Sequence, residues 1–184
     1  MPSRSSHQPR RRSRARFARR LIRSTDGSAA VEFGMVALPF ILMMFAILEL
    51  GIVFVTDSVL ENATIETGRL VRTGQASAQS MTAATFKTSL CARMSVFAAD
   101  CNSRATVDVR VIPQFATTPP DPMAGGTFNN GVLTYNNGAP GDLVLVRVWY
   151  RQPLLTTFLA QGLSRMNDGA AMLTATTAFR NEPA

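Results

Sequence analysis

The longest run of apolar residues lies near the N-terminus. From Phe33 to Thr56 the chain has 24 residues, of which only Glu49 is charged. At 1.5 Å per residue, a helix of this length spans about 36 Å, enough to cross a hydrocarbon core of about 30 Å with some tilt. The competing interpretation is a buried core helix, but a small soluble domain has little protein with which to surround a helix that is apolar on all sides. The pattern therefore predicts a membrane-spanning helix.

Two residues inside this run are unusual for a membrane helix. Pro39 lacks a backbone N–H and predicts a kink. Glu49 lies deep in the second half of the run, and an ionisable side chain at that depth indicates a function or a partner. Protonation of Glu49, or a side chain that reaches the outer interface, would also accommodate it. The sequence leaves these alternatives open.

Beyond the apolar run, the pattern changes to amphipathic helices. The first helix can continue on a thin apolar stripe as far as Gly74, where we expect it to stop. A second helix is predicted from four apolar residues that share one face and are expected to pack in the core. The stripe is Val59, Ala63, Leu70 and Val71, and the face of the second helix is Phe86, Leu90, Met94 and Phe97.

Three later segments have the alternation and the Val, Thr and aromatic content of strands, namely residues 106–112, 143–150 and 172–179. A short helix is predicted between the second and third, from Leu154 to Leu163 after Pro153. The predicted fold class is α+β: a long N-terminal transmembrane helix extends into a small domain in which a three- to four-stranded antiparallel sheet packs on helix.

Residues 113–141 separate the first two strands and differ from the rest of the chain. These 29 residues hold five Pro, five Gly and four Asn. Two Asn-Gly pairs, at Asn130-Gly131 and Asn137-Gly138, are turn signals. We expect a flexible, turn-rich insertion. It is either a tolerated excursion or a loop that displays a binding surface.

The formal net charge of +7 comes from the first 26 residues. Nine of the 19 Lys and Arg residues lie there against one acid, which leaves the rest of the chain at −1. A DNA-binding domain would spread its cations over a folded face with aromatic residues between them, whereas this segment has only Phe17. We therefore expect no nucleic-acid partner. The nine cations are Arg4, Arg10, Arg11, Arg12, Arg14, Arg16, Arg19, Arg20 and Arg23.

The position of these arginines predicts the topology. They precede the apolar run, while the first charges after it are acidic, at Asp57, Glu61 and Glu66. The positive-inside rule then puts the N-terminus in the cytoplasm and the C-terminal domain outside. We expect a single-pass protein of the bacterial inner membrane, with residues 75–184 forming a periplasmic domain.

Cys91 and Cys101 are the only cysteines. In an oxidising periplasm such a pair predicts a disulfide, worth about 3 kcal/mol in the chain-entropy model. It would tie the end of the second helix to the first strand. We expect no metal site, because two thiols alone bind a metal poorly and the only histidine is His7.

A basic segment before an apolar run is also typical of a secretory signal peptide. The apolar run here is longer than such a peptide needs, and no small-x-small cleavage site lies just beyond it. The junction Gly27-Ser28-Ala29-Ala30-Val31-Glu32 instead resembles the processing site of type IV prepilins. That resemblance implies a leader, residues 1–27, which a prepilin peptidase removes after Gly27. Ser28 becomes the first mature residue, and the Glu32 carboxylate pairs with the α-amino group of a neighbouring subunit.

The resemblance becomes more specific over residues 27–74, in which residues 28–74 are expected to form a TadE-like transmembrane helix segment. GSAAVEF at the junction, the early Pro39, the pair Glu49 and Gly51, and the later ENATIETGR together resemble the TadE-like domain of tight-adherence pilus systems. This implies a pseudopilin of the machine that builds Flp-type pili. Ser28 departs from the aromatic first residue of type IV pilins, which argues against N-methylation.

Two functions follow from these observations. The first is a minor pseudopilin, or assembly protein, of a Flp-type pilus or type II-like secretion system, with other pilin-like subunits as its partners. The second is an uncleaved single-pass protein whose periplasmic domain binds an envelope or secretion partner. We expect no enzyme, because the residues after Gly27 contain no histidine and no phosphate-binding loop. No cofactor and no small-molecule substrate are expected either.

Overall fold

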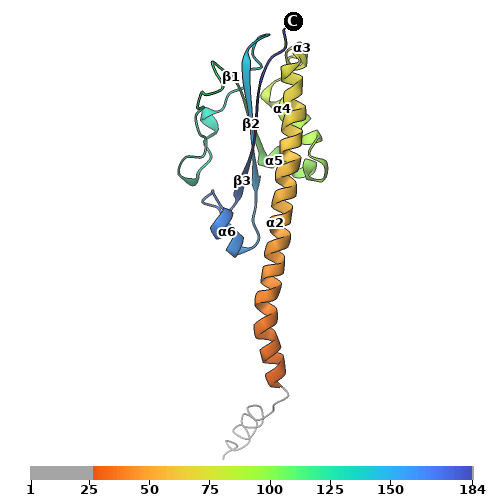
Figure 1. Ribbon diagram of the computed structural model, residues 1–184, viewed down its shortest axis with the longest axis vertical. Coiled ribbons are helices and arrows are strands. Elements are labelled where there is room, and N and C mark those ends of the chain that lie inside the picture. Colours follow the sequence, from red (N-terminus) through yellow and green to blue (C-terminus); the bar gives the residue numbers. More distant parts are fainter. Residues whose placement is uncertain (1–26, 184) are drawn as a thin grey trace, which may run out of the picture. The chain divides into compact units, whose positions relative to one another are not determined.

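The computed structural model describes residues 27–183, so that the predicted leader lies outside it except for Gly27 (Figure 1). The chain divides into two compact units, Met1–Met44 and Phe45–Ala184. Helix α2, Ser28–Arg72, contains all the described residues of the first unit except Gly27, and it continues into the second unit. It is the one helix among the described residues that is long and apolar enough to cross a membrane.

The second unit contains an antiparallel sheet of three strands in the order β1-β2-β3. The strands are β1 (Ala105–Ile112), β2 (Leu143–Gln152) and β3 (Ala171–Arg180). Val109 pairs with Val146, which in turn pairs with Thr177, so these three side chains share one face. The predicted fold class is confirmed, with three strands, and each predicted strand lies within its observed one.

Helix α2 packs along one face of this sheet (Figure 1). Its buried residues recur every three or four positions from Glu49 onwards, as expected for one face of a helix. Several of them are threonines whose hydroxyls donate to the carbonyl four residues back, as Thr64 does to Leu60 at 2.7 Å, so that they are satisfied inside the core. The buried stripe is Glu49, Val53, Thr56, Leu60, Ala63, Thr64, Thr67, Gly68 and Val71.

Helix α2 ends at Arg72, close to the predicted stop at Gly74, which has the left-handed conformation common after a helix end. The short helix α3 (Gln75–Ala78) leads to α4 (Ala83–Ala92). A capping box between Thr82 and Thr85 starts α4. The core of this unit brings Phe86 and Leu90 of α4 against the sheet.

The second predicted helix is shorter than expected. Because Phe86, Leu90, Met94 and Phe97 were placed on one helix face, the prediction ran past Ala92, where α4 ends. Met94 is buried but precedes a separate turn, η2 (Ser95–Phe97), at whose start Ser95 has a φ of 51°. The helix α5 (Ala98–Arg104), which the sequence analysis missed, follows directly.

The other face of the sheet carries a buried ionic cluster. The Asp108 carboxylate is fully buried and accepts from Arg147 Nη2 at 2.8 Å and from Arg110 Nη2 at 2.6 Å. Burial alone would raise the pKa of the Asp108 carboxyl. Hydrogen bonds from Arg110, the Thr134 N–H and Arg147 outweigh that effect and hold the pKa below its ordinary value of 3.8.

The segment 113–141 is bound to this face. It contains the turns η3 (Ala124–Gly126) and η4 (Asn130–Val132). The Thr134 N–H donates to Asp108, and Arg147 donates to the Pro120 carbonyl at 3.0 Å. The Val109 N–H donates to the Thr134 carbonyl, so the segment also pairs with the edge of β1. These bonds attach the predicted insertion to the sheet at several points, and its flexibility stays a prediction.

Candidate functional site

The predicted processing junction coincides with the start of α2. Gly27 precedes the helix, and Ser28 is its first residue. The Ser28 hydroxyl donates to Glu32 Oε1 at 2.8 Å, one turn further along. Both side chains are exposed, so the carboxylate of Glu32 remains accessible to a further donor. The structure thus brings together three of the residues on which the prepilin interpretation depends.

The helix that follows this junction has no partner for its apolar side chains among the described residues of its unit. Phe33, Met35 and Val36 are each more than 70 % exposed, and the large residues from Leu38 to Met44 are exposed too. Pro39 is itself exposed, and α2 continues on both sides of it. Such a surface is stable only in lipid or against other apolar helices.

Glu49 has hydrogen-bond partners within its own unit, the second. Its carboxylate accepts hydrogen bonds from the Thr156 N–H at 2.9 Å, from the Leu155 N–H and from the Thr156 hydroxyl. The carboxylate lies 106 residues from Leu155 in the chain, and Glu49 is only 9 % exposed. Three donors around two oxygens satisfy the charge of a buried carboxylate, so Glu49 is an intrachain anchor.

These contacts hold the two residues that precede helix α6, Thr157–Leu163, which follows β2 in the chain. Thr156 is the N-cap residue of α6, but its side chain caps no N–H of α6. Instead Glu49 accepts from the segment that leads into the helix, where the helix dipole favours a negative charge. A threonine before a helical run was a visible signal, but no spacing rule links it to a glutamate so far away.

Gly51, two residues after Glu49, makes no close approach within this chain. A Cβ built on it meets nothing within 4 Å. Gly68 differs, because a Cβ there would lie 3.2 Å from side-chain carbons of Phe179 and Thr177. The close packing of α2 on β3 therefore depends on Gly68, which the sequence analysis did not select, and not on Gly51.

Cys91 and Cys101 are joined by a disulfide. Cys91 belongs to α4 and Cys101 to α5, so the bond ties α4 to the short helix before β1 and not directly to the first strand. Both residues are buried in the core. The predicted pairing was right, but its placement was wrong because α5 was missed.

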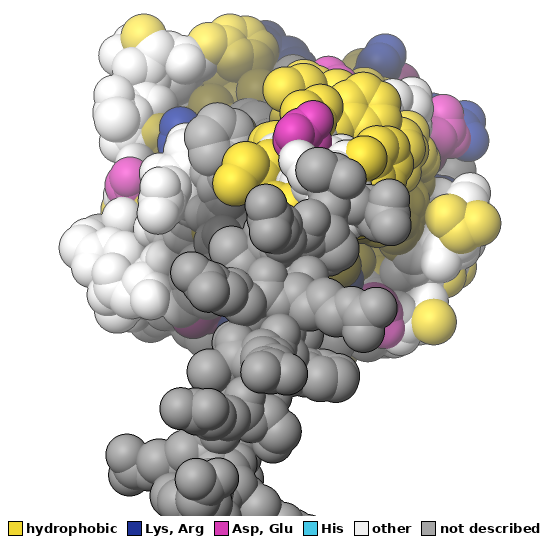
Figure 2. Space-filling model, turned by 90° about the horizontal axis from the view of Figure 1, so that it is seen from below, with side chains coloured by type: hydrophobic (Ala, Val, Ile, Leu, Met, Phe, Trp, Pro, Cys, Tyr) yellow, Lys and Arg dark blue, Asp and Glu magenta, His cyan; other side chains and the backbone are white. Residues whose placement is uncertain are grey.

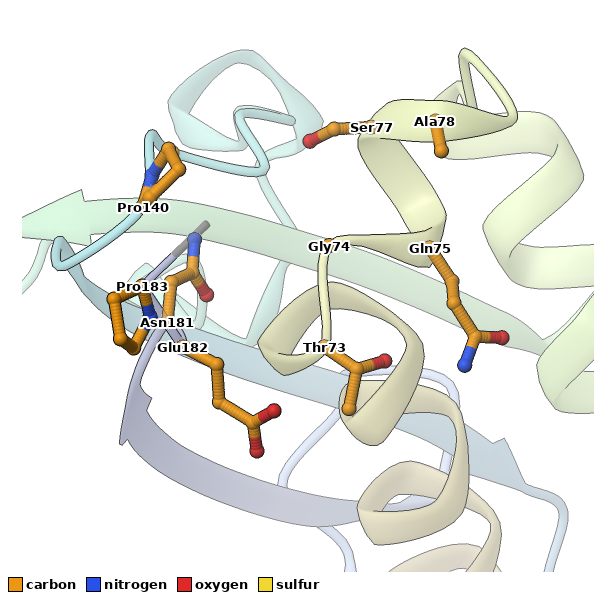
Figure 3. A pocket seen from close by; sticks show the side chains of 10 residues that line it. Thr73, Gly74, Gln75, Ser77, Ala78, Pro140, Asn181, Glu182 and Pro183 are labelled. Carbon is orange, nitrogen blue, oxygen red and sulfur yellow. The ribbon is translucent and has the colours of Figure 1, made fainter.

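An open cavity of about 400 Å³ lies where α2 ends (Figure 3). Figure 3 shows residues of the C-terminal segment on one side and residues of α3 on the other. Glu182, the single ionisable residue in its wall, pairs with Arg72 at 3.3 Å. The wall consists of Thr73, Gly74, Gln75, Ser77, Ala78, Gly138, Pro140, Asn181, Glu182 and Pro183.

The described residues contain no group of three His, Cys, Asp or Glu side chains that could hold a metal ion. The absence of enzymatic activity and of cofactors stays a prediction. The candidate functional features are therefore the junction at the start of α2, its apolar surface and the Glu49 anchor.

Comparison with known proteins supports the interpretation of the first of these. Residues 27–69 match the model of a family described as TadE-like protein. No curated protein and no solved structure matches the chain. The matched residues begin at Gly27 and run through Glu32, Pro39 and Glu49. Over residues 27–69 the chain is thus similar to the TadE-like family, as the resemblance of its sequence predicted.

Proposed function

We propose that this protein is a minor pseudopilin, a structural assembly subunit of a Flp-type tight-adherence pilus or of a related type II-like secretion system. Helix α2 anchors it in the inner membrane and packs against the helices of other pilin-like subunits. The observation that carries the proposal is the coincidence of three features: the TadE-like match begins at Gly27, α2 begins at Ser28, and an exposed Glu32 stands one turn inside it.

The chemistry of this junction favours assembly. If a prepilin peptidase removes the leader, a new α-amino group forms at Ser28. A carboxylate that enters an apolar helix bundle without a partner is costly, and an ammonium from a neighbouring subunit removes that cost. Among the described residues, Glu32 accepts a hydrogen bond from the Ser28 hydroxyl, a neutral donor that an ammonium can replace.

The topology supports the same role. The nine arginines before the junction favour a cytoplasmic leader, on the side where a prepilin peptidase cuts. The disulfide in the second unit suits an oxidising compartment such as the periplasm. The proposal needs no nucleic acid, cofactor or small-molecule substrate, and its partners are the membrane, the peptidase and other pilus-assembly subunits.

The first experiment replaces Glu32 with Ala and counts surface pili. We expect piliation to fall at least tenfold while the protein stays in the membrane fraction at its normal level. Glu61→Ala is the matched control, because it removes another exposed carboxylate of the same helix beyond the apolar run. Normal piliation by Glu32→Ala would support the alternative, an uncleaved anchored protein whose periplasmic domain binds a partner.

Processing is tested separately by immunoblotting with and without the prepilin peptidase. Cleavage after Gly27 predicts a shorter band only in the strain that has the peptidase. A Gly27→Leu variant should keep the longer form in both strains. A band of unchanged size in all strains would rule out cleavage, although a Glu32-dependent assembly role could still be measured.

A further inference from the structure

The Glu49 anchor fixes a particular segment of the second unit beside α2. That segment begins at Pro153, just after β2, and includes α6. Because Leu155 and Thr156 donate to Glu49, the start of the segment lies at the level of Glu49 along the helix. Glu49 itself lies inside the apolar run of α2. The anchor therefore holds the segment next to the most apolar part of this unit.

The segment has an unusual composition. From Pro153 to Leu163 it contains no charged residue, and it lies between two exposed arginines, Arg151, which pairs with Asp168, and Arg165. Leu155 is 90 % exposed, the highest value among the large hydrophobic residues that the structure describes as exposed. A protruding leucine in an uncharged stretch with an arginine on each side is typical of an element that lies in a membrane interface.

The adjoining surface of α2 is apolar as well. Phe45, Ile47, Leu48 and Ile52 are each more than half exposed, and they surround Glu49 in the sequence. Figure 2 shows hydrophobic side chains gathered on the face seen from below, where the first part of α2 points toward the viewer. Because the Leu155 N–H donates to Glu49, the exposed Leu155 lies beside this helical surface, which already needs an apolar environment.

A cavity of about 300 Å³ borders the same segment. Val53, Leu163 and Arg165 are among the residues that line it, so its wall combines apolar side chains with one cation. This arrangement fits an acyl chain below a phosphate headgroup better than it fits the uniformly apolar face of another helix.

We propose that the segment Pro153–Leu163 lies in the outer interface of the lipid bilayer, with Leu155 among the acyl chains and Arg151 and Arg165 at the level of anionic headgroups. This inference rests on the proposed membrane anchoring by α2. In this arrangement Glu49 positions the segment for a second contact with lipid, at the interface.

The proposal changes the expected end of the membrane span. Thr56 is fully buried in the second unit, so it cannot face lipid as the apolar run alone suggested. If the interface lies near Glu49, the span ends close to Leu48. Since a helix needs about 20 residues to cross, such a span begins near Ser28. The buried carboxylate then sits at the interface and not in the hydrocarbon core.

The test measures the depth of single probes in the full-length protein. Each variant carries one new cysteine labelled with an environment-sensitive dye, at position 155, 96 or 42, in vesicles of phosphatidylethanolamine and phosphatidylglycerol. The native cysteines are bonded to each other and do not react. Val96→Cys is the matched control, because Val96 is 84 % exposed on η2, outside the proposed segment. Leu42→Cys reports the anchoring of α2.

Lipids with a quencher near the headgroup should reduce the Leu155→Cys emission at least twofold and leave the Val96→Cys emission unchanged. Emission of Trp149 verifies that each variant is folded. If the label at 42 is quenched by deep-quencher lipids but the label at 155 behaves like the one at 96, this inference fails while the anchoring stands. A blue-shifted but unquenched label at 155 means a protein contact and also overturns it. Absence of quenching at 42 overturns both.

Discussion

Two stretches of α2 use the same helical geometry in different ways. From Phe33 to Met44 the large side chains are exposed on all sides. From Glu49 to Val71 one stripe is buried, and much of it consists of small residues and threonines. Large apolar side chains serve where the surroundings are fluid, whereas small ones allow the helix backbone to approach a rigid sheet.

This difference indicates where the folding free energy lies. The second stretch is part of the core of the second unit, so changes there should destabilise the domain. The first stretch has no partner among the described residues of its unit, so changes there should alter anchoring or assembly and leave the domain folded. The predictions below challenge this division, from the largest expected effect to the smallest.

The buried ionic cluster should be the most sensitive part of the second unit. Asp108→Asn removes the charge that two arginines contact and should cost about 3–5 kcal/mol of unfolding free energy. Urea unfolding in detergent, followed by the emission of Trp149, measures the loss. Asp168→Asn is the control, since Asp168 pairs with Arg151 on the surface, and it should cost less than about 1 kcal/mol.

The same cluster predicts a pH dependence. Because the pKa of Asp108 is lower in the folded than in the unfolded state, its contribution is fully present above the unfolded pKa and is lost as the pH falls through the folded pKa. Stability should therefore fall below a pH of about 4. Asp108→Asn should flatten this part of the profile, and an unchanged slope would assign the acid sensitivity to other carboxyl groups.

The two stretches of α2 can be compared directly with one leucine from each. Leu60 is fully buried, and Leu60→Ala should cost about 2–5 kcal/mol. Leu42 is 57 % exposed, and Leu42→Ala should leave the unfolding free energy of the domain unchanged within about 0.5 kcal/mol. Equal losses from the two variants would show that the stretches are energetically one element.

Two glycines of α2 give the smallest test. Gly68→Ala puts a methyl group 3.2 Å from carbons of Phe179 and Thr177 and should cost about 1 kcal/mol. Gly51→Ala meets nothing within 4 Å and should not destabilise the domain, since alanine favours a helix. A stable Gly68→Ala would mean that Phe179 moves aside easily. A loss of pili from Gly51→Ala would indicate a role for Gly51 between subunits.

Local patterns were sufficient for most elements of the fold. Alternating residues in β1, β2 and β3 located the sheet, because a strand with one core-facing side leaves a period-two pattern. Local patterns were insufficient around Ser95. There the spacing of apolar residues still fits a helix, but the helical backbone is interrupted. Phe86 and Leu90 do share a face, while Met94 reaches the core from a turn.

In the candidate site, too, some residues could be predicted from the sequence and others could not. Gly27, Ser28 and Glu32 are close in sequence and belong to one helix start, so their spacing alone carried the interpretation that the TadE-like match supports. Glu49 could be recognised as exceptional, but not explained, because its hydrogen-bond donors follow β2, 106 and 107 residues further along the chain. A contact between residues so far apart in the chain cannot be predicted from their spacing in the sequence.

The amino-acid sequence by itself determined the apolar helix, its charge asymmetry, the cysteine pair and the three strands, because each depends on residues that are neighbours or share a short period. Only the tertiary structure showed that Glu49 binds the segment before α6, that Gly68 allows α2 to pack closely on β3, and that Asp108 binds segment 113–141. Each of these pairs groups distant in the chain, and only the packed fold brings a buried charge to its donors or a backbone to its neighbour.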